Sequence, residues 1–197
     1  MNQELLKKNF ENHGFKTAFF ATGKEAADYL TGRIQGHKVS VGGSMTVKEM
    51  GLFELLREKN ETVWHWDVPG RDTLMNARTA DVYITSANGV SETGELVNID
   101  GTGNRVSQTL YGPEKTYFIV GNNKIREDLA GAMDRAKNVA APKNAKRLNS
   151  ATPCAVKGDR CYNCSSPGRI CRSTVIMERP SNGMEVEIVF VDEPLGY

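Results

Sequence analysis

The chain has 197 residues, a formal net charge of +1, 39% hydrophobic residues and 25% charged residues, values typical of one globular domain. This near-neutral charge gives no general attraction to nucleic acid or to an anionic membrane, and no apolar run is long enough to span a bilayer. The polar N-terminal segment also lacks the apolar core of a signal peptide, so we expect a soluble, cytoplasmic protein.

Hydrophobic spacing in the first half of the chain predicts alternating helices and strands. Residues 3–13 carry apolar side chains at helical spacing, and residues 16–21 have strand composition. Thr22 and Glu25 stand at capping-box spacing where the next helix begins, and that helix runs to about residue 34. The other elements expected in this half are a strand over 37–41, a helix over 46–58, a strand over 62–66 and a helix over 69–80.

The second half continues the alternation. The expected elements are strands over 81–87, 96–99 and 115–121, a helix over 125–138, and strands over 173–178 and 185–191 joined by a turn at 180–184. Strands that alternate with helices predict an α/β fold, here a Rossmann-like, mostly parallel sheet with helices on both faces. We expect one domain over residues 1–197, because no linker or repeat divides the chain.

A glycine-rich loop follows the predicted strand over 37–41. Gly42 and Gly43 let the backbone turn sharply, so the N–H groups of the next helix would point at a bound anion. Ser44 and Thr46 would add hydroxyl donors to the same ligand. The alternative is that Ser44 or Thr46 only caps the helix.

A longer polar loop, residues 85–106, follows the most hydrophobic predicted strand. Ligands of open α/β sheets bind at such strand ends. We therefore expect Glu92 and Glu95 to act as acids or bases, and Asn88, Asn104 and Arg105 to bind substrate. The alternative is a hairpin whose Asn-Gly and Asp-Gly pairs serve only its geometry.

Lys124 lies between the predicted strand over 115–121 and the next helix. A lysine at that position can add a cation to the same crevice as the two loops. The alternative for Lys124 alone is a solvated side chain.

All four cysteines fall in one short stretch with the spacing C-x6-C-x2-C-x6-C, at Cys154, Cys161, Cys164 and Cys171. We interpret residues 151–173 as an insertion that holds a metal ion, an iron–sulfur cluster or two disulfides. A reducing cytoplasm argues against disulfides. Interleaved basic residues suit an anionic centre; they are Lys157, Arg160, Arg169 and Arg172.

The wide outer spacings favour a four-iron cluster over zinc, because structural zinc usually takes two tight Cys-x2-4-Cys hooks and only one is present. Zinc, disulfides and free thiols remain alternatives. Such a centre could equally have a structural role, fixing this long loop to the sheet, or a catalytic one.

Four segments together resemble the LUD-domain family, which is named for lactate utilisation. They are VGGSMTVKEMG, TSANGVSETGELVNIDGTGNRV, GPEKTYFIVGNNKI and TPCAVKGDRCYNCSSPGRICR. The resemblance implies a fold similar to ribose-5-phosphate isomerase, glucosamine-6-phosphate deaminase and coenzyme A transferases. It covers the chain from about residue 38 to its C-terminal segment.

The family resemblance implies less about activity. Some members oxidise L-lactate to pyruvate together with iron–sulfur partners, which also favours the cluster, whereas other short members have no assigned reaction. The ferredoxin-like cysteine runs of the larger lactate-utilisation subunit are absent from this sequence. We expect a protein that binds a small anionic metabolite, and the first hypothesis is an enzyme acting on a hydroxy acid or sugar phosphate; the sequence leaves open whether the chain is an enzyme. The alternatives are a non-catalytic metal or redox accessory protein with a redox partner and a structural protein; a homodimer is the default assembly.

Overall fold

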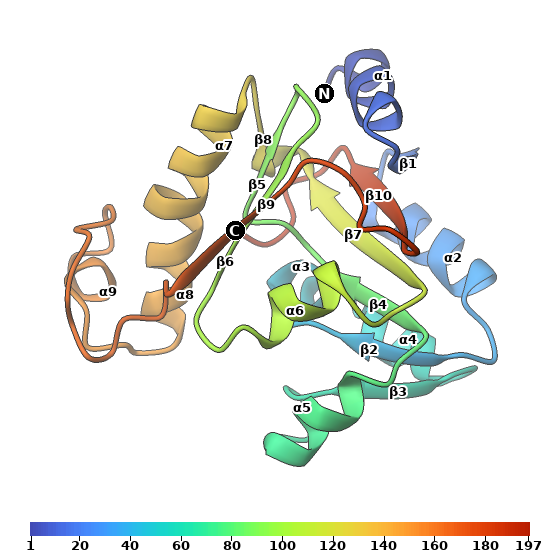
Figure 1. Ribbon diagram of the computed structural model, residues 1–197, viewed down its shortest axis with the longest axis horizontal. Coiled ribbons are helices and arrows are strands. Elements are labelled where there is room, and N and C mark those ends of the chain that lie inside the picture. Colours follow the sequence, from blue (N-terminus) through green and yellow to red (C-terminus); the bar gives the residue numbers. More distant parts are fainter.

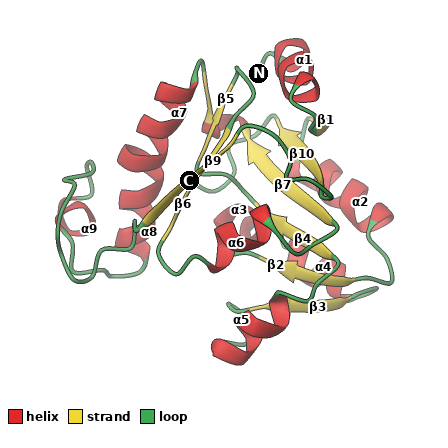
Figure 2. Ribbon diagram, viewed as in Figure 1, coloured by secondary structure: helices red, strands yellow, loops and turns green.

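The computed structural model describes all residues, Met1–Tyr197, and contains a large and a small β-sheet (Figures 1 and 2). The large sheet has six strands in the order β1-β10-β7-β4-β2-β3, and every neighbouring pair is parallel. Its strands are β1 (Lys16–Phe20), β2 (Lys38–Val41), β3 (Glu61–Trp64), β4 (Val82–Thr85), β7 (Lys115–Gly121) and β10 (Glu185–Val191). The predicted α/β fold with a mostly parallel sheet is confirmed.

Helices cover both faces of the large sheet. One face packs against α2 (Gly23–Arg33), α3 (Met45–Glu49) and α4 (Leu52–Arg57). The other face carries α1 (Gln3–Asn12) and α6 (Asn104–Leu110), while α5 (Arg71–Ala77) lies along the β3 edge. The predicted capping box at Thr22 and Glu25 is present at the start of α2.

The small sheet adds a further layer on the α1 face. Its order is β8-β5-β6-β9, with β8 (Ile125–Arg126), β5 (Gly89–Ser91), β6 (Leu96–Asp100) and β9 (Ser173–Met177). Val90 and Leu96 from this sheet share an apolar core with Phe118 and Phe190 of the large sheet. One continuous helical stretch covers its outer side: α7 (Leu129–Arg135), a π-helical segment (Ala136–Ala140) and α8 (Ala141–Arg147).

The predicted helix over 46–58 is two short helices. Gly51 adopts the left-handed region with φ of 61°, which ends α3 and starts α4. The predicted helix over 125–138 is also corrected. Residues 125–126 are strand β8, and the helix that follows continues to Arg147. Pro142 lacks the N–H that an α-helix would use at this position, and the π-helical segment directly before it has a different hydrogen-bond spacing.

The two C-terminal strands, predicted to be joined by a turn as in a hairpin, do not pair with each other. β9 pairs with β6 in the small sheet, whereas β10 lies between β1 and β7 in the large sheet. The physical reason is burial: β10 is buried on both faces over Val186–Val191, as a central parallel strand must be, while β9 is largely exposed. None of the helices has both the length and the apolar character needed to cross a bilayer.

Candidate functional site

A cavity of about 480 Å³ lies at the carboxyl ends of the parallel strands. Its floor is formed by residues that directly follow β2, β3, β4 and β7: Gly43, Ser44, His65, Trp66, Ser86, Asn88 and Lys124. The opposite walls come from the end of β6 and the start of α6, from α8, and from the C-terminal Tyr197. The cavity therefore occupies the position in which open α/β sheets bind ligands.

Six of the residues predicted to bind substrate line this cavity. They are Gly43, Ser44, Asn88, Asn104, Arg105 and Lys124. Gly42 and Thr46 lie behind the wall. A Cβ on Gly42 would meet the Tyr83 hydroxyl at 2.2 Å, so its lack of a side chain serves packing. Ser44 also caps α3 by accepting from the Val47 N–H, so both interpretations of its position hold together.

Arg105 organises the polar loop over residues 86–105. Its guanidinium donates to the Asn98 side chain at 2.6 Å, to the Ile99 carbonyl at 2.6 Å and to the Asn88 side chain at 3.0 Å. A fourth, longer bond goes to the Ser86 carbonyl at 3.3 Å. Most of its donors are therefore bound within the protein, and we interpret Arg105 as a residue that shapes the cavity wall.

Asn88 is left with an unpaired side-chain NH2 group by this network. Its Oδ1 accepts from the Ile99 N–H at 2.8 Å and from Arg105, which fixes the orientation of the amide. Its Nδ2 has no partner in the protein. Asn88 can therefore donate a hydrogen bond to a ligand in the cavity.

Asp100 has the only carboxylate side chain that lines the cavity, and its oxygens are bound to the main chain. They accept from the N–H groups of Gly101, Thr102, Arg105 and Val106 at 2.6–3.2 Å. These bonds hold the turn from β6 into α6. Asp100 forms no ion pair with the basic side chains around it.

Lys124 is buried at the floor of the cavity, with an exposed fraction of 2%. Its Nζ donates to the hydroxyls of Thr46 and Ser86, each at 2.8 Å, and it has no ion-pair partner. The pKa of Lys124 is lowered to about 7, mainly by burial and in addition by the positive charges of Arg135 and Arg105, while Glu49 opposes this shift.

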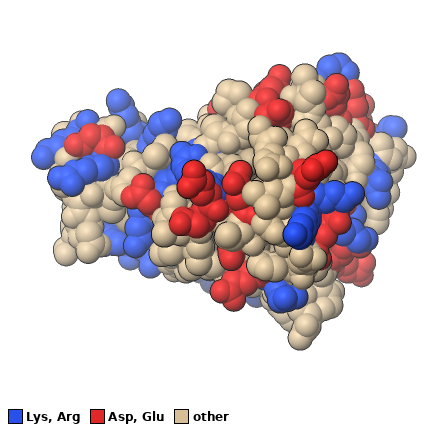
Figure 3. Space-filling model, turned by 90° about the horizontal axis from the view of Figure 1, so that it is seen from above, with Lys and Arg blue, Asp and Glu red and all other residues tan.

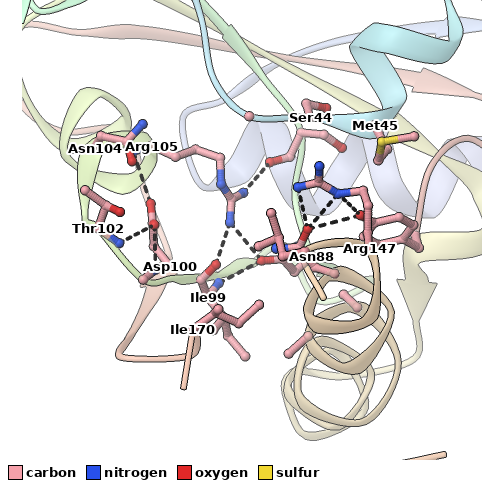
Figure 4. Close-up of a pocket in the computed structure, with 18 of the residues that line it drawn as sticks. Ser44, Met45, Asn88, Ile99, Asp100, Thr102, Asn104, Arg105, Arg147 and Ile170 are labelled. Atoms are coloured by element: carbon pink, nitrogen blue, oxygen red, sulfur yellow. Dashed lines mark hydrogen bonds between the residues drawn. The ribbon is translucent and has the colours of Figure 1, made fainter. Parts of the chain in front are cut away.

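The cavity carries an excess of positive charge. Five basic side chains line it against one acidic side chain, and none of the five belongs to an ion pair; they are Arg105, Lys124, Arg147, Arg169 and Arg172. Arg105 comes from α6 and Arg147 from α8, so the charges approach from separate elements (Figure 4). Lys and Arg side chains also gather at the end of the molecule formed by α8, α9 (Pro153–Lys157) and the cysteine residues (Figure 3).

Sequence reasoning missed several lining residues, above all His65, Trp66, Arg147 and Tyr197. Arg147 donates to the Tyr197 hydroxyl at 2.7 Å, and its guanidinium lies 4.6 Å from the centre of the Trp66 ring. His65 was assigned to a strand interior, but β3 ends at Trp64 and the imidazole reaches the cavity. Burial lowers the pKa of His65, with Asp100 opposing this effect.

Glu92 and Glu95 do not line the cavity, contrary to the expectation that they act there as acids or bases. They lie on the β5–β6 hairpin beside α1, where the Glu92 carbonyl accepts from Asn9 at 2.6 Å. The Glu95 carboxylate accepts from the hydroxyls of Ser91 and Thr93. Both residues lie away from the cavity because the hairpin extends outward from Asn88 and returns to the cavity only at Asp100.

The four cysteines line a second, smaller cavity against α8. All four thiols are free and partly exposed, and no three His, Cys, Asp or Glu side chains lie close enough to hold one metal ion. Hydrogen bonds from Ser166 lower the pKa of Cys164. Cysteine thiolates are the donors that zinc and iron–sulfur clusters use, but in this structure these four are not gathered closely enough to hold one metal ion.

The two cavities share part of their lining. Ala141, Arg169 and Ile170 line both. Arg169 donates to the carbonyls of Cys164 and Cys171 at 2.7 and 2.8 Å, and a Cβ on Gly101 would meet the Ile170 carbonyl at 2.6 Å. The cysteine residues are therefore in direct contact with the wall of the larger cavity.

Comparisons with known proteins agree with this architecture. A sequence model described as LUD domain matches residues 3–191. The crystal structure of a DUF162 family protein from Deinococcus radiodurans is similar to this chain with a TM-score of 0.56 and 10% identity, covering 95% of this chain and 94% of the other, which shows a common fold. Ribose 5 phosphate isomerase A from Neisseria gonorrhoeae matches 54% of each chain with 19% identity and a TM-score of 0.37. No curated protein matches the sequence.

Proposed function

The chain belongs to the LUD domain family, which is named for lactate utilisation, and we propose that its cavity binds a small anionic metabolite. The observation that carries this proposal is the set of basic side chains without ion-pair partners around the cavity. Unpaired cations that face one space repel each other, and an anion relieves that repulsion. The proposed ligand is a hydroxy acid or a sugar phosphate.

The volume of the cavity favours a sugar phosphate over a hydroxy acid as small as lactate. A cavity of about 480 Å³ lies within the range that encloses ligands of many heavy atoms, whereas L-lactate has only six. Ser44 and the Nδ2 of Asn88 supply neutral donors for hydroxyl groups of such a ligand. Arg147, three of whose five N–H donors remain unpaired, supplies a charged contact for its carboxylate or phosphate.

Binding can be tested by thermal shift and calorimetry with L-lactate, D-ribose 5-phosphate and inorganic phosphate. We expect at least one anion to raise the melting temperature, since a ligand that binds only the native state stabilises it. Arg147→Gln should weaken this binding. Arg57→Gln is the matched control, because Arg57 also packs on an aromatic ring, that of Phe53, but does not line the cavity. Equal binding by both variants, or no shift with any anion, would contradict the proposal.

The cysteine cavity supports a second candidate function, that of an iron–sulfur protein that exchanges electrons with a redox partner. Cys154, Cys161, Cys164 and Cys171 would hold the cluster through their thiolates. When bound, a four-iron cluster supplies one-electron transfer. Arg169 and Lys137 line the same space and would offset its negative charge. Zinc in the same four-thiol site is the alternative.

Metal analysis of anaerobically purified protein separates these alternatives. A four-iron cluster predicts visible absorbance with matching iron and sulfide contents, and Cys161→Ser should remove them. Ser165→Ala, in the same stretch of chain, is the control and should keep them. A colourless protein with one zinc ion per chain would refute the cluster.

A further inference from the structure

We propose that Lys124 is a nucleophile that forms a Schiff base with the carbonyl carbon of a small anionic aldehyde or ketone bound in the cavity. This rests on the proposed anion site and adds a covalent step to it. The inference starts from the position of Lys124: its amine is at the floor of the cavity, yet it is paired with no carboxylate.

The hydrogen bonds around Lys124 fix how its amine is used. Ser86 donates its own hydroxyl proton to the Ile119 carbonyl at 2.6 Å. Thr46 donates to the Leu195 carbonyl at 3.2 Å, with Ser86 as a longer alternative acceptor at 3.4 Å. Both hydroxyls therefore act as acceptors toward Lys124, which commits two of its N–H bonds. The third position on Nζ, a lone pair in the neutral amine, has no protein partner.

The surroundings of Lys124 favour the neutral amine, which is the form that attacks a carbonyl. Arg105 and Arg135 oppose its positive charge, and Glu49 directs its carboxylate to the Gly196 N–H at 2.6 Å. A pKa of about 7 leaves roughly half of the amine neutral at pH 7, against about 0.03% for a lysine of ordinary pKa. A lysine activated by burial and neighbouring cations is a known route to Schiff-base chemistry.

The proposed step balances without an oxidant or reductant. The Lys124 Nζ attacks the carbonyl carbon, and a C–N bond forms while the electron pair of the C=O bond moves to oxygen. The oxygen then takes up two protons, equal in number to those that the amine loses, and departs as water as the C=N bond forms. Asn88 and Ser44 line the same cavity and can donate hydrogen bonds to that oxygen.

Borohydride trapping tests the proposal directly. The full-length protein is incubated separately with glyoxylate, pyruvate and D-ribose 5-phosphate, reduced with cyanoborohydride, digested and analysed by mass spectrometry. With at least one of these probes we expect the reduced adduct on Lys124 at a level at least about 10-fold above that on the exposed Lys48 and Lys59. Lys124→Arg should abolish it, and saturating phosphate should suppress it in the wild-type protein.

The outcomes separate this proposal from the anion site itself. L-Lactate and phosphate have no aldehyde or ketone, so they test binding alone. If they bind but no carbonyl probe labels Lys124, the Schiff base is refuted and the anion site stands. Labelling spread over surface lysines, or labelling of Lys124 that phosphate does not suppress, would also refute it. If no anion binds and no probe labels, both proposals fail.

Discussion

The polar loop over residues 86–105 and the cysteine segment over residues 151–173 form adjoining walls of one cavity but are held in different ways. The polar loop contains two strands, and its residues pack in the core or bond to Arg105. In the cysteine segment only Thr152 is buried, and residues 159–165 make no backbone–backbone hydrogen bonds. The first wall is therefore held by many internal hydrogen bonds and buried contacts, whereas the second is held by few.

The largest expected difference between these two walls comes from removing their central arginines. Arg105→Met removes four hydrogen bonds from a partly buried site and leaves the Ile99 carbonyl without this donor, so we expect the free energy of unfolding to fall by about 4 kcal/mol. Arg169→Met removes bonds in a partly exposed segment, where water replaces them, and should cost about 1 kcal/mol or less. Urea unfolding followed by circular dichroism measures both. Equal losses would show that the two walls are equally ordered.

The second prediction concerns Lys124, which joins the polar loop to the floor of the cavity. Its folded pKa of about 7 lies below the unfolded value of 10.5, so between these pH values the unfolded chain binds more protons. Stability should therefore rise with pH, by about 3 kcal/mol between pH 7 and pH 10.

Lys124→Met should remove this rise, because it has no proton to bind. Urea unfolding of both proteins across pH 7–10 gives the difference, and groups common to both, such as Arg135, cancel. A parallel pH dependence in the two proteins would mean that Lys124 keeps its ordinary pKa in the folded state.

The third prediction tests the cysteine segment. If a metal centre holds it, chelation or Cys161→Ser should speed tryptic cleavage after Lys157 and Arg160 by about 10-fold, since local opening then exposes the chain. Cleavage in the polar loop after Arg105 should stay slow in the same digest. Identical rates in loaded and stripped protein would show that the segment keeps its conformation without a shared group.

The same contrast explains what the sequence could predict. The parallel strands could be predicted because β4 and β7 are mostly apolar runs between polar turns. Gly43, Asn88 and Lys124 could be predicted as site residues because each follows closely after a predicted strand. That the four cysteines lie around one space could be predicted from their short spacing in the chain. These are signals in which the informative residues are neighbours in the chain.

What failed depends on contacts between distant segments. Glu92 and Glu95 belong to the right loop, but the loop pairs as a hairpin with β8 and β9, which turns them toward α1. Arg147 meets Trp66 only because α8 returns across the small sheet, and no local pattern encodes that contact. The turn before β10 suggested a hairpin, but β10 pairs with β1 and β7, because a strand buried on both faces belongs in the centre of the parallel sheet.

The smallest expected effect on stability belongs to Arg147, at the edge where the two walls meet. Its side chain is exposed and lies over the Trp66 ring, so Arg147→Gln should change the free energy of unfolding by only about 0.5 kcal/mol. Arg57→Gln, at a similar distance from the Phe53 ring, also loses exposed ion pairs to Glu54 and Asp67 and should change it by about 1 kcal/mol or less. Only the Arg147 variant should also lose affinity for the anion, by roughly 10-fold, because a charged contact to the ligand is lost. A large stability loss in Arg147→Gln would show that α8 needs this contact to stay on the sheet, and its affinity change would then reflect folding instead of ligand recognition.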